Sequence, residues 1–205
     1  MKRNFSNQAL PLVMSILCLA GTAAGQNITP SEREQALQYL NETRDGVVQS
    51  VKGLSEAQWK YKPGPSRWSI AEVVEHLALI ENFFLDGVRP LLTKSPAIQP
   101  NADAKKVDEL MLTRLLDRST KYQAPPNAVP TGRWIPQEAL QHFVSARQQT
   151  SGFLSSASEL RAHIVVHPAF GKLDGYQWVM AVAGHSARHT KQILEVKDDP
   201  NFPAN

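Results

Sequence analysis

The sequence predicts an all-α fold, an antiparallel four-helix bundle with a long crossover insertion between the second and third helices. Four segments carry apolar residues at the three- and four-residue spacing that is typical of amphipathic helices. No stretch of useful length shows the alternation of apolar and polar residues that indicates a strand. A proline-rich stretch, residues 90–131, separates the second segment from the third and has too few apolar residues for a core of its own.

Residues 1–25 have the three regions of a secretory signal peptide. A basic start precedes the apolar run Ala9–Ala20, and the small residues Gly21–Gly25 follow it. The run is shorter than the roughly 20 residues of a membrane span, which argues against an uncleaved anchor. We expect cleavage after Gly25, with cleavage after Ala24 as the alternative. Residues 26–205 would then be a single exported domain, periplasmic or secreted, without stable insertion in a membrane.

The cysteine content and the charge exclude some kinds of chemistry and some partners. The one cysteine, Cys18, lies in the leader behind Ile16 and Leu17, and this context does not fit a lipid-attachment site. The mature domain therefore has neither a thiol nucleophile nor a disulfide. Lys2 and Arg3 leave with the leader, so most of the net charge of +3 leaves as well. Because no run of Lys or Arg remains, we expect no nucleic-acid partner.

The first helix is predicted over Ser31–Lys52, with Thr29 or Ser31 as its N-cap and Gly53 at its end. The loop that follows, residues 53–68, either folds onto the bundle or walls a pocket with its large aromatic side chains, Trp59, Tyr61 and Trp68. The capping box Ser69–Glu72 begins the second helix. That helix should run to about Val88, before Pro90.

The insertion is expected to hold one short helix around Asp103–Leu112. The third helix should begin at Pro136 and end at about Ser156. An extended link, Leu160–Gly171, leads to the fourth helix, Gly175–Val196, for which Asp174 is the predicted cap.

The fourth helix carries the residues that suggest a chemistry. His185 and His189 are four positions apart, so their side chains share one helix face. That face is otherwise apolar and should turn toward the core, with Trp178, Val182 and Ile193. Each buried imidazole needs a partner for its nitrogens, and a divalent metal ion satisfies both rings at once.

The best third ligand is His76, at mid-length of the second helix and on its inward edge. The other candidates, held in reserve, are His142, His163 and His167. The alternative is that the histidines lie on the surface or are hydrogen-bonded in the core. The pair does not form the zinc-protease motif, because Ser186 stands where that motif needs its catalytic glutamate.

Two further side chains have two interpretations each. Glu72 could orient His76 or accept a proton, but the simpler interpretation is that it only completes the capping box. Arg188 could meet an anionic group of a substrate, but the simpler interpretation is a solvated helix arginine.

The chain resembles the DinB-like (DinB/YfiT) superfamily in three features: the motif Trp68-Ser69 at a helix start, His76 within that helix, and the run Gly184–Ile193. The stretch His167–Gly171 before the last helix is also similar to that family, and the resemblance covers roughly residues 31–198. It implies a four-helix bundle in which three histidines, here His76, His185 and His189, bind one divalent ion, zinc or nickel.

The resemblance implies a metal-dependent transferase or hydrolase, since known members include thiol S-transferases and mycothiol-dependent isomerases. The chain departs from those enzymes in two features. The enzymes work in the cytoplasm, whereas this chain has a predicted export signal. No residue pattern in this chain identifies a thiol-binding site. The alternative is a non-catalytic metal-binding or interaction bundle. The substrate of an enzyme would be an unknown small molecule, and bundles of this kind often form homodimers.

Overall fold

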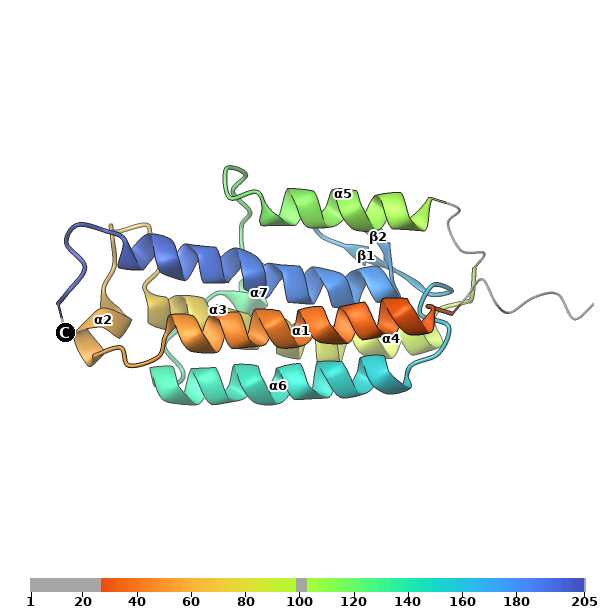
Figure 1. The fold of residues 1–205 in the computed structure, drawn as a ribbon, viewed down its shortest axis with the longest axis horizontal. Coiled ribbons are helices and arrows are strands. Elements are labelled where there is room, and N and C mark those ends of the chain that lie inside the picture. The colour runs from red at the N-terminus through yellow and green to blue at the C-terminus, as the bar shows by residue number, and fades with distance from the viewer. Residues whose placement is uncertain (1–26, 99–102, 205) are drawn as a thin grey trace, which may run out of the picture.

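The computed structural model describes residues 27–98 and 103–204, so the predicted signal peptide lies outside the described residues. Four long helices form the bundle: α1 (Pro30–Ser50), α3 (Ile70–Asn82), α6 (Pro136–Ser156) and α7 (Gly175–Lys197). Figure 1 shows them side by side along the long axis of the molecule. The predicted all-α four-helix bundle is confirmed. In the described part of the chain, no helix is both long and apolar enough to cross a membrane.

The crossover sets the directions of the helices. α3 and α6 run in one direction, and α1 and α7 run in the other (Figure 1). α1 and α3 each pack against both α6 and α7. Each long helix therefore has one antiparallel and one parallel neighbour. The crossover itself contains α5 (Ala104–Leu116), which packs on α7, and the short 3-10 helix η3 (Pro126–Ala128). α5 is four residues longer at its C-terminal end than predicted.

Two local predictions in the first half of the chain were wrong. The loop after α1 contains a short helix, α2 (Glu56–Lys60), with its own capping box from Ser55 and Gln58. Pro90 does not end the second helix, because α3 continues through the π-helix η2 (Phe83–Val88) into α4 (Arg89–Lys94). Pro90 is the second residue of α4, directly after the π-helix, and the backbone stays helical on both sides of the junction, at Val88 and at Arg89.

The predicted extended link is in fact a β-hairpin. β1 (Ile164–His167) pairs antiparallel with β2 (Gly171–Asp174), and His167 lies opposite Gly171. Four-residue strands are too short for alternation to be recognised in the sequence. Gly171 has a φ of 74°, a left-handed conformation that glycine adopts without strain. The hairpin leads directly into α7, whose N-cap is Asp174 as predicted.

A buried polar layer divides the core. On α1, Leu40 belongs to one apolar cluster and Val47 to another, and Thr43 lies between them. At the same level the guanidinium of Arg147 on α6 donates hydrogen bonds to Thr43, to Glu81 of α3 and to Ser186 of α7. Arg147 and Glu81 are both fully buried. The Arg147 side chain thus joins all four long helices, and its partner on α7, Ser186, directly follows His185 in the sequence.

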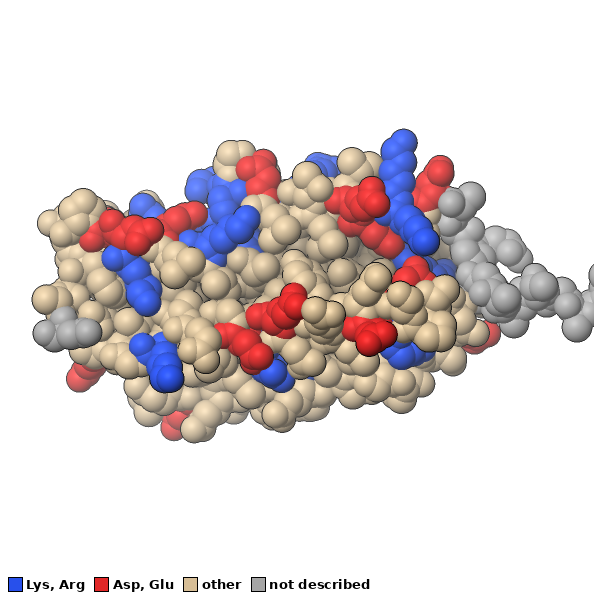
Figure 2. Space-filling view, in the orientation of Figure 1, with Lys and Arg blue, Asp and Glu red and all other residues tan. Residues whose placement is uncertain are grey.

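Charges are mixed over the surface. Figure 2 shows Lys and Arg side chains interspersed with Asp and Glu on the visible face, without a large area of one sign.

Candidate metal centre

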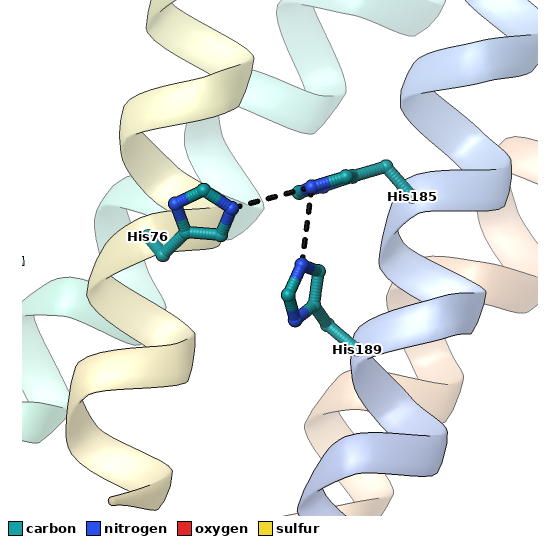
Figure 3. A group of neighbouring side chains, drawn as sticks. All are labelled: His76, His185 and His189. Atoms are coloured by element: carbon teal, nitrogen blue, oxygen red, sulfur yellow. Dashed lines mark hydrogen bonds between the residues drawn. The ribbon is translucent and has the colours of Figure 1, made fainter. Parts of the chain in front are cut away.

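α7 places His185 and His189 on the side that faces α3, as the four-residue spacing predicts. Their Nε2 atoms lie 3.1 Å apart. His76 reaches the same point from α3, and its Nε2 lies 3.2 Å from that of His185. Figure 3 shows the three rings converging from the two helices. The three predicted histidines therefore come together, with ligand atoms all within 4.8 Å of one another.

Two of the rings are oriented by hydrogen bonds at their far nitrogen. The Nδ1 of His76 lies 2.7 Å from the carbonyl oxygen of Ala128, in the crossover. The Nδ1 of His189 lies 2.9 Å from the Oε1 of Gln192, one turn further along α7. A carbonyl oxygen accepts but cannot donate, so in both rings Nδ1 carries the proton. Their Nε2 atoms consequently present lone pairs toward His185.

The crossover is held against α3 at this point. The buried carboxylate of Glu75, the neighbour of His76, accepts hydrogen bonds from the backbone N–H groups of Thr131 and Gly132. This contact holds the segment that places the Ala128 carbonyl beside the Nδ1 of His76. Neither Glu75 nor Ala128 could be assigned this role from sequence, because the partners are more than fifty residues apart.

The three histidines are neutral in the folded protein. Burial lowers the pKa of His76 from 6.5 to about 4. Burial also lowers the pKa of His185 and of His189 well below the usual value, and repulsion between protons on neighbouring rings lowers it further. Neutral imidazole is the form that binds metal ions.

The arrangement of the three Nε2 atoms suits coordination of one divalent ion better than hydrogen bonding among the three rings. The lone pairs of His76 and His189 both face the Nε2 of His185, and this nitrogen can donate at most one proton. The buried Nδ1 of His185 has no hydrogen-bond partner in the described structure. Ligands of a tetrahedral zinc ion with bonds of about 2.0–2.1 Å lie about 3.3 Å apart. The observed 3.1 and 3.2 Å separations come close to that value.

The group lies on the wall of a large cavity of about 1060 Å³. Apolar side chains form much of the wall, namely Ile80, Phe83, Phe84, Leu115, Trp178 and Val182. Charged side chains lie elsewhere along it, among them Arg67, Arg118, Lys121 and Glu195. Phe83 and Phe84 belong to the π-helix, an element that the sequence did not reveal. In residues 27–98 and 103–204, no further His, Cys, Asp or Glu offers a ligand atom to the group.

The reserve histidines lie elsewhere. His142 is stacked on Trp134 with a ring separation of 4.2 Å, and His163 bonds to Ser95, the C-cap of α4. His167 lines the cavity but does not join the metal-ligand group. Of the aromatic residues in the loop after α1, Trp59 is buried in the core, whereas Trp68 lines the cavity 4.8 Å from the His76 ring.

Glu72 completes the capping box of α3, whose N-cap is Ser69. Its carboxylate accepts a hydrogen bond from the N–H of Ser69 and pairs with Lys62. Arg188 is not a solvated arginine, because only 4% of it is exposed. Its guanidinium donates to the carbonyl oxygens of Leu115, Asp117 and Thr120, and so fastens the end of α5 and the following loop to α7.

A sequence model of the DinB superfamily matches residues 29–193 of the chain. The uncharacterized protein YuaE of Bacillus subtilis (strain 168) is 27% identical over 164 residues, which cover 79% of this chain and 97% of YuaE.

Two solved structures have a similar fold. YfiT from Bacillus subtilis is described as a probable metal-dependent hydrolase with an unusual four-helix bundle topology. It superimposes with a TM-score of 0.59 at 18% identity, covering 86% of this chain and 91% of YfiT. The four-helix bundle protein TT2238 gives a TM-score of 0.52 at 20% identity, covering 80% of this chain and 98% of TT2238.

Proposed function

The chain belongs to the DinB superfamily, and on this basis we propose that it is an exported metal-dependent hydrolase or transferase that acts on a small molecule. His76, His185 and His189 would hold one divalent ion, zinc or nickel. One observation carries this proposal: three Nε2 atoms converge on the wall of a cavity of about 1060 Å³, and no fourth ligand closes the site in the described part of the chain. Catalytic metal sites commonly use three protein ligands and leave a position open.

A divalent ion at this site would polarise a substrate oxygen or lower the pKa of a bound water or substrate thiol. The residues of the chain have more limited tasks. The Ala128 carbonyl and Gln192 keep the lone pairs of His76 and His189 directed at the site. Phe83 and Trp178 give the cavity an apolar wall that would displace water from a bound substrate. The description of YfiT as a probable metal-dependent hydrolase, on a similar fold, supports the same reaction class.

A second function, non-catalytic metal binding, is favoured by a different observation. Among the described residues, no carboxylate joins the metal-ligand group, and Glu72 is engaged in capping α3. The site therefore lacks an evident general base of its own. Metal binding without turnover of any ester or thiol substrate would support this function.

The test begins with the metal content of protein purified from cells that express the full chain. Wild type should contain about one equivalent of zinc or nickel, and His76→Ala and His185→Ala should lose it. His142→Ala is the matched control, because this exposed histidine lies outside the site. Hydrolysis of 4-nitrophenyl acetate and transfer of small thiols should then depend on the metal. Failure of wild type to bind either ion, even after incubation with it, would contradict the proposal.

Export is tested on the same preparation. The proposed leader predicts a mature N-terminus at Gln26, read from intact mass or N-terminal sequencing. An unprocessed chain that stays in the cytoplasm would contradict export and leave the metal site unaffected.

A further inference from the structure

His167 shares the cavity with the three histidines but is not one of their group. It is the last residue of β1, and the hairpin turn that follows it supplies Pro168 and Ala169 to the same wall. His167 is close enough to the metal-ligand group for its charge to affect the pKa of His185. Neither hydrogen bonding within the metal-ligand group nor the capping of α7 uses this residue.

The His167 ring is fixed in place by aromatic neighbours. Its centre lies 4.6 Å from that of Trp178 and 4.8 Å from that of Phe170. Trp178 is itself fixed, because its Nε1–H donates a 3.0 Å hydrogen bond to the carbonyl oxygen of Val165 in β1. The hairpin and α7 therefore hold the ring in one orientation on the cavity wall.

A backbone hydrogen bond sets the tautomer of His167. The N–H of Ala169 donates to its Nδ1 over 3.0 Å, so this nitrogen must present a lone pair. A neutral imidazole then carries its proton on Nε2. Burial lowers the pKa of His167 to about 4, which agrees with a neutral ring at ordinary pH. In the part of the chain that the structure describes, this Nε2–H has no hydrogen-bond acceptor.

We propose that His167 is a substrate-binding residue whose Nε2–H donates a hydrogen bond to an oxygen of the molecule bound in the cavity. The neighbouring wall is apolar, with Trp178 and Phe83 in ring contact. A neutral N–H donor that packs against Trp178 and Phe170 pairs with a neutral acceptor oxygen without the desolvation cost of burying a charge. The substrate class is therefore a small molecule that joins an apolar group to a carbonyl-type oxygen, as in an ester or amide. This inference rests on the proposed function.

Two variants separate the hydrogen bond from the packing. His167→Phe keeps a flat ring against Trp178 but removes the donor. His167→Gln places a side-chain N–H near the position of Nε2 and keeps it. The probe is benzohydroxamate, which combines a phenyl ring, a carbonyl oxygen and a metal-binding group. Its affinity for the zinc-loaded protein is measured by calorimetry.

We expect H167F to bind benzohydroxamate about 3- to 10-fold more weakly than wild type, the usual effect of one neutral hydrogen bond. H167Q should stay within about 2-fold of wild type, and all three proteins should hold the same amount of zinc. Nitrogen-15 NMR of wild type should show the Nε2–H tautomer of His167, and the signal of that proton should move on addition of the probe.

Four results would overturn the inference: equal affinity of H167F and wild type, loss of zinc in H167F, an Nδ1–H tautomer, or no binding of benzohydroxamate to zinc-loaded wild type. These results differ from failure of the proposed function. Wild type that binds zinc and the probe but hydrolyses no ester would contradict the proposed reaction while leaving the role of His167 intact.

Discussion

Replacing His76 with leucine should make the metal-free protein less sensitive to acid. In the unfolded chain this residue takes up a proton near its ordinary pKa of 6.5, whereas burial lowers the pKa of the folded residue to about 4. Between these two values the unfolded state binds more protons than the folded state. Stability that His76 contributes is therefore complete above about pH 6.5 and is lost as the pH falls toward about 4.

The magnitude follows from the two pKa values. At about pH 5 the unfolded residue is mostly charged and the folded residue is mostly neutral, so proton linkage at His76 lowers the free energy of unfolding by about 2 kcal/mol relative to about pH 7. Only 3% of His76 is exposed, so solvent does little to reduce the effect. His76→Leu also loses the hydrogen bond to Ala128. That loss does not depend on pH and leaves the comparison intact.

The assay is urea unfolding of chelator-treated wild type, His76→Leu and His142→Leu at about pH 7 and about pH 5. The difference between the two pH values should be about 2 kcal/mol smaller in His76→Leu than in wild type. His142→Leu, at an exposed position, should match wild type. An equal pH dependence of wild type and His76→Leu would refute the argument that burial keeps His76 neutral.

Two further substitutions test the supports of the site. Gln192→Ala should weaken zinc binding by about 10- to 100-fold, because the His189 ring loses the acceptor that sets its tautomer. Competition with a chromophoric chelator measures the zinc affinity, which Gln192→Glu should retain. An unchanged affinity in Gln192→Ala would exclude this role of Gln192. Arg147→Met should lower the free energy of unfolding by about 3–5 kcal/mol, because it leaves Glu81 buried without its cation. Adding Glu81→Gln should recover part of that loss, and no recovery would indicate that Arg147 acts mainly through its contacts with α1 and α7.

Features that depend on local periodicity could be predicted from the amino-acid sequence. Helical spacing gave the four long helices and placed His185 and His189 on one inward face. Capping chemistry gave the starts of α3 and α7, because Ser69 and Asp174 act on backbone groups only three residues away. The mid-helix position of His76 was enough to select it as the partner of the pair.

The surroundings of these residues depend on contacts between segments far apart in the chain. The carbonyl of Ala128 fixes the His76 ring from 52 residues further along the chain. Arg188 is buried by the end of α5, some seventy residues before it, and its bonds to backbone oxygens leave no trace in the pattern of side chains. The hairpin that presents His167 and the π-helix that presents Phe83 are short, and their geometry comes from packing rather than periodicity. Periodicity records which face of a helix is buried, whereas the tautomer and accessibility of a buried histidine depend on atoms that only folding brings near it.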